Sequence, residues 1–294
     1  MTKNFVPLLI FNIFIFKCFA QVPTTDIYLL DMNTKHGNFA FTNAQKISDW
    51  KGYNNQPYFT PDGKFIYYVS YRNKQADIYK YDIGSKMTVQ FTDTPEDEYS
   101  PKLTPDGNYI SVVRVMKDSS QQLWGFPLEG RASKHLLKGH DSIGYYCWMK
   151  NKIITANVPE PMKLEITDTT PGSPNLTMIK NVGRSLQIIQ NKFVLFIQKP
   201  ANKKDSINSI CLLFKNQVIP LVATLPNCED FALGAKNTLF MGKNGKLYKY
   251  RIGKDKEWIE VADFTNTEFK NFYRIVINKK GNKIAFVSYQ GKKP

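Results

Sequence analysis

Two stretches of the chain repeat the same order of apolar and polar positions, 44 residues apart. They are 56–70 and 100–113, and both contain Pro, a spacer, an apolar residue, Thr, Pro, Asp and Gly in register. Pro-Asp-Gly is typical of a tight turn, because Pro fixes φ, Asp bonds to the nearby backbone and Gly accepts positive φ. Apolar residues precede and follow each turn, so each stretch predicts a β-hairpin.

Two further strands complete each repeat. In the first repeat, 77–82 alternates with a period of two, and 88–92 forms a short closing strand. In the second repeat, the corresponding strands are predicted at 122–126 and 134–137. Four consecutive antiparallel strands of this kind are the blade of a β-propeller.

Later repeats lose the triplet but keep the spacing. With Gly63 and Gly107 as the first two markers, turns recur after steps of 44, 44, 40, 46 and 44 residues, at Asn151, Asn191, Asn237 and Gly281. Asn is the usual substitute for Gly where φ is positive. The later second strands are predicted at 153–154, 193–196, 239–241 and 284–287, and the later third strands at 163–166, 210–213 and 246–250. The chain therefore contains six repeats.

The two ends of the chain complement each other. The sixth repeat stops at Tyr289 after two strands, whereas the N-terminal region begins with two strands that lack a partner, 26–31 and 45–48. Joined to the sixth repeat, these strands would complete the last blade and close the ring, which removes exposed sheet edges. We therefore predict that residues 21–294 form a single all-β domain, a six-bladed β-propeller of four-stranded antiparallel blades.

The repeat resembles that of the TolB-like propellers, which are relatives of the WD-repeat family. The resemblance rests on Thr-Pro-Asp-Gly-Lys at 60–64 and Asp-Ile-Tyr at 77–79, and it is strongest over 56–137. It implies an exported bacterial protein that acts as a protein-binding platform at the cell envelope, or a non-catalytic domain beside a peptidase. The α/β domain that precedes the propeller of TolB is expected to be absent, because only a short segment precedes the first strands.

Residues 1–20 have the pattern of a secretory signal peptide. Lys3 precedes an apolar run over 5–16, and Cys18-Phe19-Ala20 places small residues before a cleavage site after Ala20. The run is too short to span a bilayer, which takes roughly 20 residues. Lys17 disfavours lipid attachment at Cys18. We therefore predict a periplasmic or secreted protein with no transmembrane segment after cleavage.

The charge indicates what kind of partner to expect. The formal net charge is +15, and it stays strongly positive when Lys3 and Lys17 are removed with the signal peptide. A basic surface favours acidic partners. The expected partners are an envelope or extracellular protein and, as a second class, an acidic glycan. Export argues against nucleic acid, and the oligomeric state stays open.

Three cysteines remain after cleavage: Cys147, Cys211 and Cys228. Export permits disulfides, but three cysteines cannot all pair within one chain. Cys211 and Cys228 are the closer pair in sequence. The sequence leaves two possibilities, a Cys211–Cys228 bridge or a set of buried free thiols.

Motifs for catalysis and cofactors are missing from the sequence. It contains neither Gly-x-Ser-x-Gly nor His-Glu-x-x-His, and no phosphate-binding glycine loop. No catalytic residue and no cofactor are therefore predicted. His140 beside Asp141 is a weak candidate for a general base. The acidic loop over 92–98 offers weak metal candidates at Asp93, Glu96 and Asp97, although their spacing matches no EF-hand.

The geometry of a propeller predicts one binding site, at the mouth of the central channel where the innermost strands begin. The residues expected there are Gln56, Glu98, Tyr99, Tyr145, Tyr146, Arg184, Glu229, Asp230, Tyr273 and Arg274, with Asn55 beside them. Tyr and Arg commonly anchor interfaces, which favours a non-catalytic scaffold that binds a protein or glycan. The alternative is a metal-dependent hydrolase or lactonase that uses Glu98, Glu229 and Asp230 in the channel. A purely structural envelope component is the third possibility.

Overall fold

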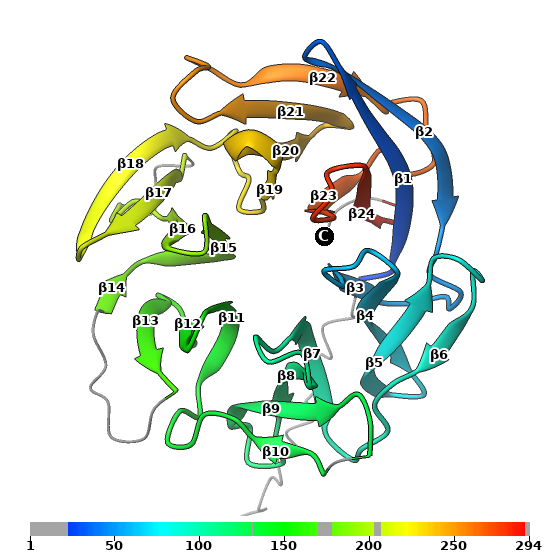
Figure 1. The fold of residues 1–294 in the computed structure, drawn as a ribbon, viewed down its shortest axis with the longest axis vertical. Helices are drawn as coiled ribbons and strands as arrows, with labels where there is room; N and C mark the ends of the chain where they lie inside the picture. The colour runs from blue at the N-terminus through cyan, green and yellow to red at the C-terminus, as the bar shows by residue number, and fades with distance from the viewer. Residues whose placement is uncertain (1–22, 131, 170–177, 203–206, 292–294) are drawn as a thin grey trace, which may run out of the picture.

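Six four-stranded antiparallel sheets surround a central channel in the computed structural model (Figure 1). The structure describes residues 23–130, 132–169, 178–202 and 207–291, and the predicted signal peptide lies outside these residues. In the described part of the chain, only the 3₁₀ turn η1 (Ala235–Asn237) is helical. The predicted six-bladed propeller is therefore confirmed.

In five blades, the strands follow chain order from the channel outwards. Blade 1 contains β3 (Asn54–Phe59), β4 (Phe65–Arg72), β5 (Gln75–Asp82) and β6 (Thr88–Gln90). Blade 2 contains β7 (Asp97–Leu103), β8 (Tyr109–Val115), β9 (Gln121–Pro127) and β10 (Lys134–His135). Blade 3 contains β11 (Ile143–Met149), β12 (Lys152–Asn157), β13 (Lys163–Asp168) and β14 (Met178–Lys180). Blade 4 contains β15 (Val182–Ile189), β16 (Phe193–Gln198), β17 (Ser209–Phe214) and β18 (Gln217–Ala223). Blade 5 contains β19 (Ala232–Gly234), β20 (Thr238–Lys243), β21 (Lys246–Arg251) and β22 (Ile259–Asp263).

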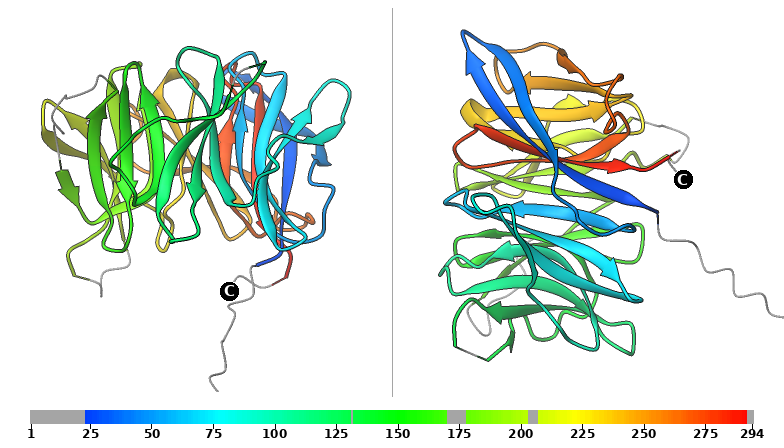
Figure 2. Two further views of the ribbon diagram at one scale, coloured as in Figure 1. Left: turned by 90° about the horizontal axis from the view of Figure 1, so that it is seen from below. Right: turned by 90° about the vertical axis from the view of Figure 1, so that its right-hand side faces the viewer.

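Blade 6 closes the ring with strands from both ends of the chain. Its order from the channel is β23 (Phe272–Ile277), β24 (Lys283–Tyr289), β1 (Thr25–Lys35) and β2 (Asn38–Lys46). β1 pairs antiparallel with β24 from Thr25–Tyr289 to Asp31–Lys283, and the side views show the two strands together (Figure 2). The predicted closure is confirmed.

The outer hairpin of blade 6 is longer than the sequence pattern indicates. The fourth strand was expected at 45–48, but β2 begins at Asn38 because β1 continues to Lys35 before the chain turns. Only Gln45 and Lys46 of the expected strand belong to β2. Ile47 follows the strand, and its N–H donates to the Ile27 carbonyl at 2.9 Å.

The repeated turn has the predicted conformation in the first two blades. Gly63 and Gly107 both have φ of +73°, and the Asp62 carboxylate accepts hydrogen bonds from the Thr60 hydroxyl at 2.6 Å and the Lys64 N–H at 3.0 Å. In blade 3 the expectation for Asn151 is wrong. Lys150 takes the left-handed conformation instead, with φ of +55°, and the Asn151 amide bonds to Asp168 at 3.2 Å.

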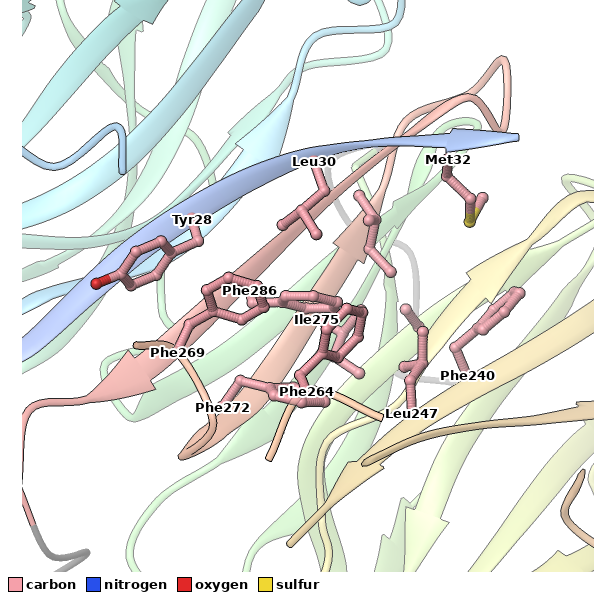
Figure 3. Close-up of a cluster of buried hydrophobic side chains, with 12 residues drawn as sticks. Tyr28, Leu30, Met32, Phe240, Leu247, Phe264, Phe269, Phe272, Ile275 and Phe286 are labelled. Atoms are coloured by element: carbon pink, nitrogen blue, oxygen red, sulfur yellow. The ribbon is translucent and has the colours of Figure 1, made fainter. Parts of the chain in front are cut away.

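The hydrophobic core lies between the blades, so both faces of a blade are buried. On β1, Tyr28 and Leu30 pack on the blade 5 side, whereas Ile27 and Leu29 pack on the blade 1 side. This arrangement explains the uninterrupted apolar run, because a strand buried on both faces shows no polar alternation. Figure 3 shows the first of these clusters, in which Phe272 and Phe286 stack with ring centroids 4.4 Å apart.

No disulfide joins the described cysteines, so the Cys211–Cys228 bridge does not form. Cys211 packs in the core between blades 3 and 4, together with Cys147. Cys228 instead packs in the core between blades 4 and 5. The two residues lie on opposite faces of blade 4, which explains why their closeness in sequence does not bring their sulfurs together.

Candidate functional site

The innermost strands bulge where they line the channel. The pairing register shifts in five of them, β3, β7, β11, β15 and β23. In β3 and β7 the bulge contains Gln56 and Ser100, which have φ of +52° and +56° and precede Pro57 and Pro101. Bulges redirect side chains, and Pro is tolerated in a strand chiefly at such positions. The prolines were the sequence signal for this feature.

The channel contains three connected cavities. The central cavity has a volume of about 90 Å³ and shares Arg184 and Asp230 with a wider cavity of about 460 Å³, here called the wide mouth. The wide mouth lies where the innermost strands of blades 5 and 6 begin. A third cavity of about 340 Å³ shares Pro57 and Lys102 with the centre and lies toward the opposite face.

An ion-pair network crosses the channel between the blades. Asp230, which precedes β19, accepts a hydrogen bond from Arg184 Nε at 3.0 Å and lies 3.4 Å from Arg274 Nε. Arg274 also donates to Asn55 Oδ1 at 2.8 Å, and the Asn55 amide donates to the Tyr273 hydroxyl at 2.6 Å. The network thus joins blades 4, 6 and 1 through the loop before blade 5.

In this network, the nearby positive charges change the pKa of Asp230 more than its burial does. The Asp230 side chain is 9% exposed and the Arg274 side chain 14% exposed. Burial alone would raise the pKa of Asp230, but the adjacent guanidinium groups of Arg184 and Arg274 lower it below its ordinary value. Asp230 is therefore a permanently ionised partner of two cations, which suits it to positioning the arginines rather than to proton transfer.

Most of the residues predicted for the mouth do line the channel. Six of them border the central cavity: Gln56, Tyr145, Tyr146, Arg184, Asp230 and Arg274. Glu229 and Tyr273 border the wide mouth. The Tyr146 hydroxyl points away into the gap between blades 2 and 3, where it donates to the Ser111 carbonyl at 2.7 Å.

Glu98 and Tyr99 border neither the central cavity nor the wide mouth. The Glu98 side chain is fully buried between blades 1 and 2, where it accepts a hydrogen bond from Thr94 and lies 3.5 Å from Arg114 Nε. Tyr99 packs against the hydrophobic clusters on both faces of blade 2. The sequence located the beginning of β7 but not the direction of these two side chains.

The three carboxylates considered for a catalytic metal do not converge. Glu98 lies between blades, Asp230 pairs with two arginines, and Glu229 forms an ion pair with Lys199 at 2.9 Å. Two of the weak candidates, Glu96 and Asp97, are engaged by other partners. Glu96 pairs with Arg114, and Asp97 accepts the Ala76 N–H at 2.8 Å. The described residues contain no group of three or more His, Cys, Asp or Glu placed to hold a metal ion.

His140 has neighbours other than the predicted Asp141. Its Nε2 lies 3.4 Å from the Thr167 hydroxyl, and its Nδ1 lies 3.4 Å from the Lys138 carbonyl oxygen. Its ring therefore lies against β13, at the outer part of blade 3, rather than in the channel. This position gives no support to a role as general base at the channel.

Solved structures share this fold. Putative TolB from Agrobacterium tumefaciens matches with a TM-score of 0.65 and 10% identity, over 92% of this chain and 99% of that one. TolB from Acinetobacter baumannii matches with a TM-score of 0.58 and 14% identity, over 92% of this chain. This chain spans 65% of the length of the Acinetobacter protein. A comparison with known protein families found no match.

Proteins named as enzymes share the fold too. A putative gluconolactonase matches with a TM-score of 0.58 and 7% identity, over 84% of this chain and 91% of that one. An oligogalacturonate lyase in complex with manganese matches with a TM-score of 0.52 and 10% identity, over 87% and 83% of the two chains. At these identities the comparisons show the fold alone, a six-bladed propeller of the kind found in TolB. Within the described residues, no helix has the length and apolar character needed to cross a membrane.

Proposed function

We propose that this protein is an exported, non-catalytic propeller that binds a protein partner at the wide mouth of its channel. The observation that supports this most is the aromatic and cationic lining of that cavity. Tyr273 and Tyr289 stack with ring centroids 4.4 Å apart, and the Arg184 guanidinium lies 5.9 Å from the Tyr273 ring. Tyrosine and arginine in a partly enclosed pocket are the usual anchors of an interface.

Further cations surround the wide mouth. Lys243 and Lys270 border it, so an acidic surface would approach it favourably. The basic net charge of +15 acts in the same direction at longer range. An acidic protein of the envelope or extracellular space is the partner that this charge and the predicted signal peptide favour. An acidic glycan is the second class.

The enzyme alternative has a specific observation in its favour, the likeness to propellers titled gluconolactonase and oligogalacturonate lyase. In this chain, a metal bound by Glu229 and Asp230 would have to displace Lys199 from the first and two arginines from the second. Such pairs are costly to break when they are buried. The scaffold is therefore the function that the geometry supports better.

Affinity isolation from envelope extracts tests the scaffold. The bait is the mature chain, compared with a mouth variant that combines Tyr289→Ala with Lys270→Glu. The control is Lys150→Glu, an equal charge change at the turn between β11 and β12. We expect the mouth variant to recover at least one partner about tenfold less well than the other two baits do. A tenfold loss of affinity corresponds to about 1.4 kcal/mol of binding free energy. Equal recovery by all three baits would contradict the proposal.

Metal analysis of the purified mature protein tests the alternative. The hypothesis of a metal-dependent enzyme would be supported if the protein contains a stoichiometric metal and if its melting temperature falls on chelation. The same result would overturn the proposed non-catalytic scaffold. Glu229→Gln and Asp230→Asn would then be the variants to assay, because both residues border the wide mouth.

A further inference from the structure

Lys102, a cation in the channel, has no anionic partner among the residues that the structure describes. Lys102 on β7 borders both the central cavity and the third cavity, and its side chain is half-buried. Among the described residues its ammonium group forms no ion pair, and the centroid of the Tyr58 ring lies 5.7 Å from Nζ. A cation held away from water without a counter-charge is unfavourable. An anionic ligand would therefore stabilise the charge of Lys102.

The charges around the central cavity do not balance. Lys102, Arg184 and Arg274 border it, whereas Asp230 is the one carboxylate among its lining residues. Asp230 is already shared between the two arginines. Burial lowers the pKa of Lys102, and the positive charge of Arg274 lowers it further. The cavity thus carries an excess of positive charge that an anion would neutralise.

The size of the central cavity restricts the anion. Its volume of about 90 Å³ is several times the minimum that a single water requires, but it falls well below the usual range for pockets that enclose a drug-sized ligand. A carboxylate group fits this space. Gln56 also lines the cavity, and because its Oε1 accepts the Ser100 N–H at 2.6 Å, its amide nitrogen is the atom that could donate to a ligand.

We propose that the central cavity binds a single carboxylate group, held by Lys102, Arg184 and Arg274 and presented by an acidic side chain of the partner that enters through the wide mouth. Arginine and lysine bind carboxylates by charge-assisted hydrogen bonds. The wide mouth, at about 460 Å³, has room for the peptide segment that carries the side chain. The claim that the partner supplies the carboxylate rests on the proposed function. The claim that the central cavity binds an anion does not.

Small probes test the site on the full mature protein without any partner. The first probe is an acetylated, amidated pentapeptide with one Asp between glycines, and its control is the same peptide with Asn. We expect the Asp peptide to bind at least about tenfold more tightly, because charged hydrogen-bond partners contribute more than neutral ones. Sodium acetate, compared with sodium chloride at equal ionic strength, measures binding of a free carboxylate.

Variants connect the binding to Lys102. Lys102→Met is expected to abolish the preference for Asp over Asn, whereas Lys117→Met, an exposed lysine on the loop after β8, should keep it. Lys102→Met should also melt at a higher temperature than the wild type, because it removes an unpaired charge from the channel. Lys102→Gln serves as a second variant if Lys102→Met does not fold.

Each outcome bears on the proposal. An equal affinity for the two peptides in the wild type, or an unchanged Asp preference in both Lys102 variants, overturns it. If acetate binds but the protein shows no preference for the Asp peptide, the ligand of the cavity is a free small acid. That result overturns the proposal that an acidic side chain of the partner supplies the carboxylate. An Asp preference that depends on Lys102 supports the site even if no envelope partner is isolated, so the proposed function can fail separately.

Discussion

Asp230 and Glu98 show how neighbours decide the chemistry of similar carboxylates. Both lie at or just before the beginning of an innermost strand, and both are buried. Asp230 faces two guanidinium groups across the channel, which lower its pKa. Glu98 is held between blades 1 and 2 near Asp77, and burial raises its pKa to about 8. Two buried carboxylates near the beginning of innermost strands thus produce an ionised network in one place and a proton-holding pair in the other.

The contrast teaches that position within a blade does not define a site. Asp230 meets arginines that come from blades 4 and 6, through bulges in β15 and β23. Glu98 meets Asp77 of blade 1, whose pKa burial raises to about 6. The adjoining blade therefore decides whether a carboxylate is ionised.

Asp230→Ala is expected to have the largest effect on stability. It leaves two guanidinium groups in the channel without their counter-charge, and removing one member of a buried ion pair typically costs about 3–5 kcal/mol. The free energy of unfolding, measured by urea denaturation, checks this value. A loss no larger than that of an exposed surface substitution would show that the network does not stabilise the ring.

Glu98 should make stability depend on pH in the opposite direction to an ordinary ion-paired carboxylate. The folded state retains a proton that the unfolded state releases above about pH 4.5, so stability should fall as pH rises from there to about 8. Glu98→Gln should match the wild type at pH 5 and exceed its stability at pH 9 by roughly 1–3 kcal/mol. Denaturation at the two pH values measures this difference, and equal stability at pH 9 would contradict the raised pKa.

Gly183→Ala should weaken the network indirectly. A Cβ at Gly183 would lie 2.8 Å from Ile197 side-chain atoms, so β15 would have to shift at the bulge that carries Arg184. Overpacking of this kind typically costs about 1–3 kcal/mol. Ile197→Ala removes the Cγ2 atom of this contact, so part of the loss should be recovered when the double variant is compared with Ile197→Ala alone. No recovery would indicate that the loss has another cause.

Asp263→Ala should have the smallest effect. Its ion pair with Lys246, at 3.4 Å, lies at the exposed outer strands of blade 5. Solvent and salt screen such pairs, so we expect no measurable change in the denaturation midpoint. This variant is the matched control for Asp230→Ala. A comparable loss in both would mean that the channel position confers no special importance.

Much of the fold could be predicted from local patterns. The Pro-Asp-Gly turns defined the register of blades 1 and 2, because their conformation depends on residues that are adjacent in sequence. Spacing alone then located the degenerate blades. The predicted position of positive φ in the first turn of blade 3 was wrong by one residue, because a short turn can place positive φ at either of two neighbouring positions.

The candidate site was predictable only in part. Arg184, Asp230 and Arg274 were expected at the channel, and the structure places them there. Their pairing was not predictable, since Arg184 and Arg274 lie 90 residues apart and meet only when the ring closes. Lys102 was missed, because its place within a repeated motif indicates a strand and says nothing of the channel.

The repeat, the strands, the number of blades and the closure of the ring could all be predicted from the sequence, because turn chemistry and apolar periodicity act over short distances. Only the tertiary structure decided which side chains face the channel and which charges they meet. Bulges redirect individual side chains, as at Gln56, and neighbouring blades supply the partners, as for Glu98. The excess of positive charge around Lys102 is a property of the assembled ring, because no single repeat contains it.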